Sequence, residues 1–257
     1  MRIFVVKKNT LIRAAVFLLL IIGAIVYTQV ALSDAMPVSS MSEPMPVCRV
    51  KTEEKAVALT IDSAFGDTDY TEQILDVLED ESVHATFFVM GLWAKDNPEA
   101  LNAIIKSGNE VANHSMNHKR YPDMNTDEIV ADANAAEALI SDNTGFDMRV
   151  IRMPFGAFDS QSVIALENEG YIPVKWSLDS KDWKGYDSVK IADGVLREVK
   201  SGDIIMFQNN MAATPEALRA VILGLREQGF KIVTVSGLLL DGDPIVDSSG
   251  TQRYFED

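Results

Sequence analysis

Short apolar runs alternate with amphipathic stretches along most of this chain, and this alternation constrains the fold more than any other feature. Runs rich in β-branched and aromatic residues predict strands at 57–61, 85–91, 150–154, 171–176, 203–207 and 231–235, with a weaker seventh at 110–113. Continuous apolar runs are typical of parallel strands, because helices cover both faces of a parallel sheet. The regular alternation therefore predicts an α/β fold with a parallel sheet, which we expect to close into a barrel.

The stretches between these runs carry apolar residues at helical spacing. They predict helices over residues 71–80, 99–108, 126–142, 162–170 and 214–229. Three of them begin with a threonine whose hydroxyl could accept a hydrogen bond from the first turn. We therefore expect Thr71, Thr126 and Thr214 to be N-caps.

The first 33 residues differ from the rest in charge and hydropathy. They contain four basic residues and no acidic one, and an apolar run over residues 14–27 extends less strictly to Leu32. A basic segment followed by about 20 apolar residues is typical of a membrane anchor or a secretory signal. Residues 33–35 lack the small-residue pattern of a cleavage site, so we expect residues 1–32 to be an uncleaved transmembrane helix.

A linker and one folded domain are expected to follow this segment. Residues 33–46 are rich in serine and proline without an apolar period, which is typical of an extended linker. The positive-inside rule would keep the basic flank in the cytoplasm. We therefore expect a single-pass protein of the cell membrane, with residues 47–257 as an extracytoplasmic domain.

Charge and cysteine content exclude some classes of function. The whole chain carries −15 and its first 33 residues carry +4, which leaves −19 on the remainder. Such an acidic domain argues against binding of nucleic acid or anionic lipid, although a neutral glycan remains compatible with it. Cys48 is the single cysteine, so no disulfide can form within the chain, and we expect an inert thiol.

Polar residues cluster where the expected strands end. The carboxyl ends of parallel strands meet at one edge of a sheet or barrel, and sites in α/β folds gather there. We therefore expect these residues to lie close together. They are Asp62, His114, His118, Arg152, Asp179, Asp182, Trp183, Gln208 and Asn209.

Five segments around these residues resemble, in order and spacing, the motifs of NodB-type polysaccharide deacetylases, also called carbohydrate esterase family 4. The resemblance covers roughly residues 50–240. TID (60–62) resembles the start of the TFDDG motif, and ANHSMNH (112–118) resembles the H-x-x-x-H motif. RMPFG (152–156) resembles R-x-P-[YF]-G, and DSKDW (179–183) resembles D-x-x-D-W. IIMFQN (204–209) stands in the place of the L-x-H motif. The TIDSAFGD variant of the first motif resembles a sporulation-associated subset from Gram-positive bacteria.

The resemblance implies a distorted (β/α) barrel of the NodB type. It also implies a divalent metal, with zinc as the expected ion, and removal of acetyl groups from a cell-wall polysaccharide such as peptidoglycan or an N-acetylglucosamine polymer. By this resemblance His114 and His118 would bind the metal, and Asp62 would be the general base, aimed by Arg152. Asp179 would hold Arg152 or tune that pair. The backbone N–H of Phe155 would donate to the oxyanion, and Trp183 and Met206 would form walls of the acetyl pocket.

The chemistry of amide hydrolysis agrees with these residue types. A divalent metal lowers the pKa of bound water to about 7 and polarises the carbonyl. His114 and His118 are four residues apart and would share one face if their segment is helical. Structural roles stay open as alternatives: an exposed polar face for the two histidines, an ion pair for Arg152 with Asp179, and core packing for Trp183. His84 precedes an apolar run, so we expect a surface residue and no ligand.

Two positions depart from the family pattern. Ser63 stands where the family has a metal-binding aspartate, and a neutral hydroxyl is a poor substitute for that ligand. Asp67, four residues further on, could reach back in its place. Gln208 stands where the family has the histidine that acts as general acid, and a glutamine cannot deliver a proton near neutral pH.

Three hypotheses follow from the motifs and their departures. The first is metal-dependent de-N-acetylation of a cell-wall polysaccharide, with weakened activity and a weakened zinc site. The second is a catalytically degenerate barrel that binds glycan as a scaffold or sensor. The third is an esterase or deacetylase with a rebuilt general acid.

Overall fold

The computed structural model describes residue 21, residues 43–144 and residues 148–255. Except for residue 21, the expected anchor over residues 1–32 lies outside the described residues, as does most of the expected linker over residues 33–46. Within the described part of the chain, no helix is long and apolar enough to cross a membrane. Residues 43–257 form one compact unit, and the fold below is that of this unit.

A parallel sheet lies at the centre of this unit, in the strand order β6-β5-β4-β3-β2-β8-β7, and β9 also pairs with β2. Each of the seven predicted strand segments overlaps one of its strands, whereas β7 was not predicted. The strands are β2 (Ala56–Ser63), β3 (Thr86–Val89), β4 (Glu110–Asn113), β5 (Val150–Ile151), β6 (Ile172–Pro173), β7 (Leu178–Asp179), β8 (Ile204–Gln208) and β9 (Lys231–Val233).

The sheet does not close into the expected barrel. β6 and β7 are its two edges and do not pair with each other among the described residues, so the fold is an α/β half-barrel of parallel strands. The segment around β1 (Arg49–Val50) runs through the gap, where Val47 bridges Val174 beyond β6 and Arg49 bridges Asp203 before β8. β1 also pairs with β11 (Thr251–Arg253), which pairs with β10 (Ile245–Val246) in a second, small sheet.

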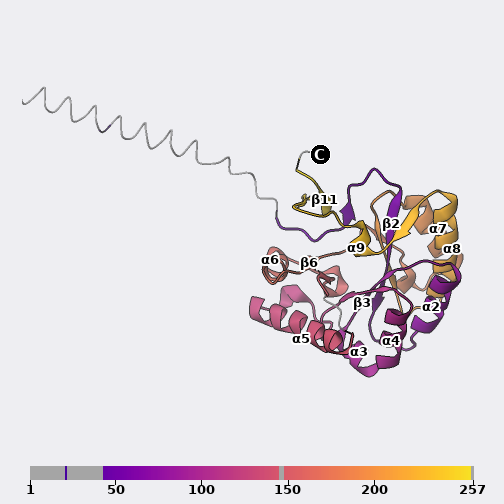
Figure 1. Cartoon of the computed structure of the whole chain (residues 1–257), viewed down its shortest axis with the longest axis horizontal. Helices are drawn as coiled ribbons and strands as arrows, with labels where there is room; N and C mark the ends of the chain where they lie inside the picture. Colours follow the sequence, from indigo (N-terminus) through magenta and orange to yellow (C-terminus); the bar gives the residue numbers. More distant parts are fainter. Residues whose placement is uncertain (1–20, 22–42, 145–147, 256–257) are drawn as a thin grey trace, which may run out of the picture. The chain divides into compact units, whose positions relative to one another are not determined.

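Helices surround the central strands, with α7 and α8 side by side on one flank and α5 and α6 together on another (Figure 1). The five predicted helices are present with similar bounds, and α3, α7 and α9 are additional. The helices are α2 (Thr71–Asp80), α3 (Gly91–Asp96), α4 (Pro98–Lys106), α5 (Thr126–Thr144), α6 (Ser160–Asn168), α7 (Ser188–Glu198), α8 (Thr214–Glu227) and α9 (Val235–Leu238), with 3₁₀ turns η1 (Tyr121–Asp123), η2 (Pro154–Gly156) and η3 (Asp182–Lys184).

The prediction of threonine N-caps was wrong in each case. Thr71, Thr126 and Thr214 are the first residues of their helices. Neighbouring side chains do the capping at two of these ends. Asp69 accepts a hydrogen bond from the Thr71 N–H, and the Asn125 side chain accepts one from the N–H of Glu128. The caps therefore lie one or two positions earlier, which helical spacing alone does not determine.

The two-residue period of β2 separates the core from the site. Alternate residues such as Val57, Leu59 and Ile61 point into the main core beneath α2, α7 and α8. The intervening Ala56 and Ala58 belong to a second cluster on the other face of the sheet, which we call the inner face. Because side chains alternate along a strand, Thr60 and Asp62 continue that inner face toward the carboxyl end. The inner face is therefore apolar at one end and polar at the other.

The gap segment yields a prediction about stability. Gly202 has φ +80°, and a Cβ there would lie 1.7 Å from the carbonyl oxygen of Val50. Gly202→Ala should lower the free energy of unfolding by about 3 kcal/mol, since β1 must move in addition to the cost of the left-handed backbone. Gly229→Ala is the matched control, because its φ is also +80° but no atom lies within 4 Å. It should cost only about 1 kcal/mol. Urea unfolding of the full-length variants measures both, and equal losses would contradict the proposed clash.

Candidate active site

The polar end of the inner face is organised around a buried ion pair. Arg152 follows β5 and is fully buried. One terminal nitrogen donates to Asp62 Oδ1 at 2.6 Å and to Thr60 Oγ1 at 2.8 Å, and the other donates to the Lys175 carbonyl at 2.7 Å. The guanidinium also stacks on the Phe88 ring, 3.8 Å from its centroid. The fully buried Arg152 thus holds Asp62 in one orientation.

His114 and His118 meet beside this pair, but the reason differs from the expected one. Their segment is not helical, because Ser115 and His118 have φ values of 69° and 54°. This tight loop still brings the two rings to a centroid distance of 5.0 Å. His114 Nδ1 lies 2.8 Å from the Arg152 carbonyl, so Nδ1 carries the proton. His114 Nε2 is left as an acceptor, 3.9 Å from Asp62 Oδ2.

Residues that the sequence reasoning missed hold this loop in place. The Ser115 hydroxyl accepts from the His118 N–H, and the Asn113 side chain accepts from the Ser115 N–H. Asp132 on α5 accepts from the Met116 N–H at 3.0 Å and from the Asn117 side chain at 2.6 Å. Asp132 is buried although it is charged, yet a single aspartate within a helical pattern gives no signal of this role.

Burial keeps both histidines neutral near pH 7. Burial lowers the pKa of His114 from its ordinary value, and the nearby Asp62 carboxylate opposes this only in part. Burial also lowers the pKa of His118, to about 4, with a further contribution from repulsion by His114. Neutral imidazoles can accept hydrogen bonds or bind a cation, whereas imidazolium cannot.

A cavity of about 310 Å³ opens over these groups. Among the predicted substrate-binding residues, Phe155, Met206 and Gln208 line it. Phe155 has φ 61°, which is unusual for a residue other than glycine and typical of functional sites. Its exposed ring lies against His118, with 4.5 Å between centroids. The full lining consists of Asp62, Ala64, Phe65, Met90, His114, His118, Phe155, Trp176, Met206, Gln208 and Asn210.

Two predicted site residues lie elsewhere. Trp183 does not line this cavity; its indole nitrogen lies 3.3 Å from Asp179, and Trp176 stands in the wall instead. Within the described part of the chain, Asp179 accepts from Lys181 N and from Trp183 rather than from Arg152. The expected Asp179–Arg152 contact is therefore wrong. The left-handed Lys181 turns the chain at η3, which directs the Trp183 side chain toward Asp179.

Asp182 has a larger structural role than the sequence suggested. It is 1% exposed and accepts from the Gln208 N–H at 2.8 Å and from the Thr214 hydroxyl at 2.7 Å. Burial raises the pKa of its carboxyl group, and these hydrogen bonds oppose the rise. Asp182 thus fixes the end of β8, where Gln208 enters the cavity.

The donor set does not fit a catalytic zinc site. Such sites use three protein ligands, whereas here only two imidazoles line the cavity. Ser63 offers a hydroxyl that is buried without a partner among the described residues, and it does not line the cavity. No group of three His, Cys, Asp or Glu side chains in the described ranges could hold a metal ion. Asp67 is exposed and does not line the cavity, so it does not replace the missing ligand.

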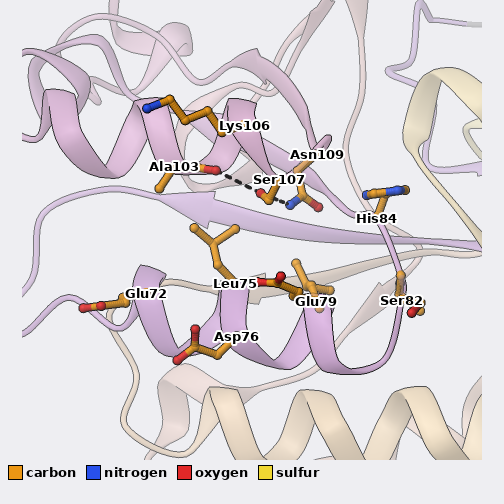
Figure 2. A pocket seen from close by; sticks show the side chains of 12 residues that line it. Glu72, Leu75, Asp76, Glu79, Ser82, His84, Ala103, Lys106, Ser107 and Asn109 are labelled. Atoms are coloured by element: carbon orange, nitrogen blue, oxygen red, sulfur yellow. Dashed lines mark hydrogen bonds between the residues drawn. The ribbon is translucent and has the colours of Figure 1, made fainter.

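A second groove, of about 760 Å³, lies between α2 and α4 and is separate from this cavity (Figure 2). His84 lines it, two residues before β3 begins. Asp62 pairs with Phe88 near the other end of that strand. His84 is therefore a surface residue at the opposite end of the sheet from the cavity, as the sequence predicted.

Comparisons with known proteins agree with the geometry. A model of the polysaccharide deacetylase family matches residues 49–174. The peptidoglycan-N-acetylglucosamine deacetylase of Bacillus cereus is 33% identical over 201 residues, which cover 74% of this chain and 91% of that protein. The peptidoglycan-N-acetylmuramic acid deacetylase PdaC of Bacillus subtilis is 31% identical over 74% of this chain and 40% of its own length.

One solved structure with a similar fold belongs to a pseudoenzyme of this family. The pseudoenzyme BA3943 of Bacillus anthracis, a member of carbohydrate esterase family 4, is 31% identical with a TM-score of 0.72, over 76% of this chain and 69% of that one. A mutant of the same protein, with a TM-score of 0.72 and 32% identity, has restored enzymatic activity.

The lowered pKa of His118 predicts a pH-dependent stability. Between pH 6.5 and about 4 the unfolded chain binds a proton at this residue that the folded chain does not, so stability falls as pH falls through this window. Since the side chain is partly exposed, the loss should be on the order of 1–2 kcal/mol. Urea unfolding at several pH values in the presence of a chelator measures it. His118→Gln should flatten the slope, whereas His84→Gln should leave most of it; an unchanged slope in His118→Gln contradicts the assignment.

Proposed function

The chain belongs to the polysaccharide deacetylase family, and from this premise we propose that it binds and slowly de-N-acetylates a cell-wall polysaccharide. Members of this family are hydrolases of carbon–nitrogen bonds other than peptide bonds. The observation that carries the proposal is the Asp62–Arg152 ion pair, which faces one cavity together with the two neutral histidines. An N-acetyl group is the substrate feature that fits a small cavity with both apolar and polar walls.

The residues present can perform part of the hydrolysis. Asp62 accepts a proton from water while Arg152 fixes its orientation, and its second oxygen faces His114. The backbone N–H of Phe155 is the proposed donor to the developing oxyanion. Met206 supplies an apolar wall for the acetyl methyl group.

The same site explains why turnover should be slow. Gln208 can hydrogen-bond to the departing amine but cannot protonate it, and loss of a general acid typically costs a factor of about 10²–10⁴ in rate. Ser63 supplies no anionic ligand beside the histidines. The zinc dependence that the family resemblance implied is therefore not part of the proposed mechanism.

A second candidate function is glycan binding without turnover. The specific observation in its favour is that Asp62 and Gln208 are register partners on adjacent strands, with Ser63 next in line. Both departures from the family motifs therefore fall at the carboxyl ends of two adjacent strands, and of the two it is Gln208 that lines the cavity. Such a protein would act as a cell-wall scaffold or sensor.

Restoring the two family residues distinguishes these functions. Acetate release from N-acetylated chitooligosaccharides and from peptidoglycan should be slow in the full-length protein and should vanish in Asp62→Asn. Ser63→Asp with Gln208→His should raise the rate at least about 10²-fold when zinc is supplied. Asp67→Asn is the matched control for a carboxylate outside the cavity and should keep the original rate.

The outcomes separate clearly. Glycan binding without acetate release in the original protein supports the second candidate and overturns slow catalysis. The absence of both glycan binding and acetate release, even in the double variant, would contradict both functions.

We propose further that the domain acts outside the cytoplasm, attached through residues 1–32. The proposal is supported by residues 1–32, in which basic residues precede an apolar run. A cell-wall substrate also requires a domain that lies outside the cytoplasm. Protease added to intact cells from which the wall has been removed should digest residues 47–257, and their protection would contradict the proposal. The sporulation-associated role stays a prediction.

A further inference from the structure

An exposed phenylalanine stands at the edge of the cavity, directly after the ion-paired strand. β2 ends at Ser63, and Phe65, two residues further on, lines the cavity and is 49% exposed. An aromatic ring of this size usually contributes to a core or an interface. The hydrolysis described above assigns no role to it.

The backbone of this segment is clamped to the end of β8 by two consecutive asparagines. The Asn209 side chain accepts from the Ala64 N–H at 3.2 Å, and the Asn210 amide donates to the Phe65 carbonyl at 3.1 Å. Asn209 is itself fixed through Asp69 and Thr71. The two hydrogen bonds restrain the chain on both sides of the ring.

Close packing limits the segment further. A Cβ at Gly66 would lie 2.5 Å from the Asn210 Cβ, so the backbone and the asparagine are in direct contact. A ring that is solvent-exposed while its backbone is held on both sides is preorganised. Preorganisation lowers the entropic cost of binding a ligand.

A second exposed aromatic lines the same cavity from another strand. Phe155 follows β5 and is 61% exposed, and β3 and β4 separate β5 from β2 in the sheet. The cavity edge thus carries aromatic rings from separate places, while the polar groups lie deeper. Flat apolar rings around a polar centre complement a sugar, whose C–H groups form apolar faces and whose hydroxyls point outward.

We propose that Phe65 is a sugar-stacking residue, whose ring packs against the C–H face of a pyranose adjoining the sugar whose N-acetyl group enters the cavity. The inference rests on the proposed function, and it names the substrate class more narrowly. The site prefers an oligomeric glycan of at least two pyranose rings over a single N-acetylated sugar.

Calorimetric titration of the full-length protein tests the proposal with N-acetylglucosamine and N-acetylchitotetraose as probes. The original protein should bind the tetramer more tightly than the monomer. Phe65→Ala should weaken tetramer binding about tenfold and leave monomer binding nearly unchanged. Phe65→Trp should restore tetramer binding, whereas Phe65→Leu, which is apolar but lacks a ring face, should restore little of it.

Phe255→Ala is the matched control, because this phenylalanine is 81% exposed and does not line the cavity. It should bind the tetramer as the original protein does. If Phe65→Ala binds the tetramer normally while the original protein shows the length preference, the stacking role is overturned and the proposed function stands. If the original protein binds neither sugar, the proposed glycan function and the stacking role fail together. Thermal unfolding of each variant verifies that a loss of binding is not a loss of fold.

Discussion

The pairing of Arg152 with Asp62 is the interaction on which the rest of this structure depends. A fully buried guanidinium is costly unless each of its charges and donors is matched, and removal of one partner of such a pair is strongly destabilising. Here the partners come from separate strands: Asp62 and Thr60 from β2, the Lys175 carbonyl from beyond β6, and the Phe88 ring from β3. The half-barrel must be correctly assembled before these partners reach the cation, whose Nε stays without a hydrogen-bond partner among the described residues. Fold and site are therefore specified by the same contacts.

The sequence was informative wherever a regular period carries the information. The continuous apolar runs located seven strands, and their ends located Asp62, His114 and Arg152, because a two-residue alternation decides which side chains share the inner face. The position of His118 follows from left-handed residues in a short loop, which no period describes. The same holds for Trp183, whose direction is set by the turn at Lys181. The apolar pattern also could not predict whether the barrel closes, since closure depends on whether β6 and β7 pair with each other.

The two departures from the family motifs affect the site and not the scaffold. Ser63 and Gln208 end two adjacent strands, and the interior on which those strands depend is filled by Ala56, Ala58 and Ile204 further back. Asp182 still holds the backbone of Gln208 as it would hold that of another residue. The chain can therefore change its chemistry at this edge while the half-barrel stays intact. Family membership and catalytic power are separate properties here.

The segment that fills the gap in the half-barrel also has a mechanical consequence. Its backbone bonds reach Pro173, Gly202, Gly250 and Gln252, which belong to distant parts of the chain. A pull on the chain ahead of Val47 would load these bonds first, and they lie along β1 rather than around the cavity. Another backbone bond of this segment joins Val47 to Lys175, whose carbonyl accepts from Arg152, so loss of the amino-terminal strand would also disturb a partner of the ion pair. The amino-terminal segment is therefore coupled mechanically to the site as well as to the second sheet.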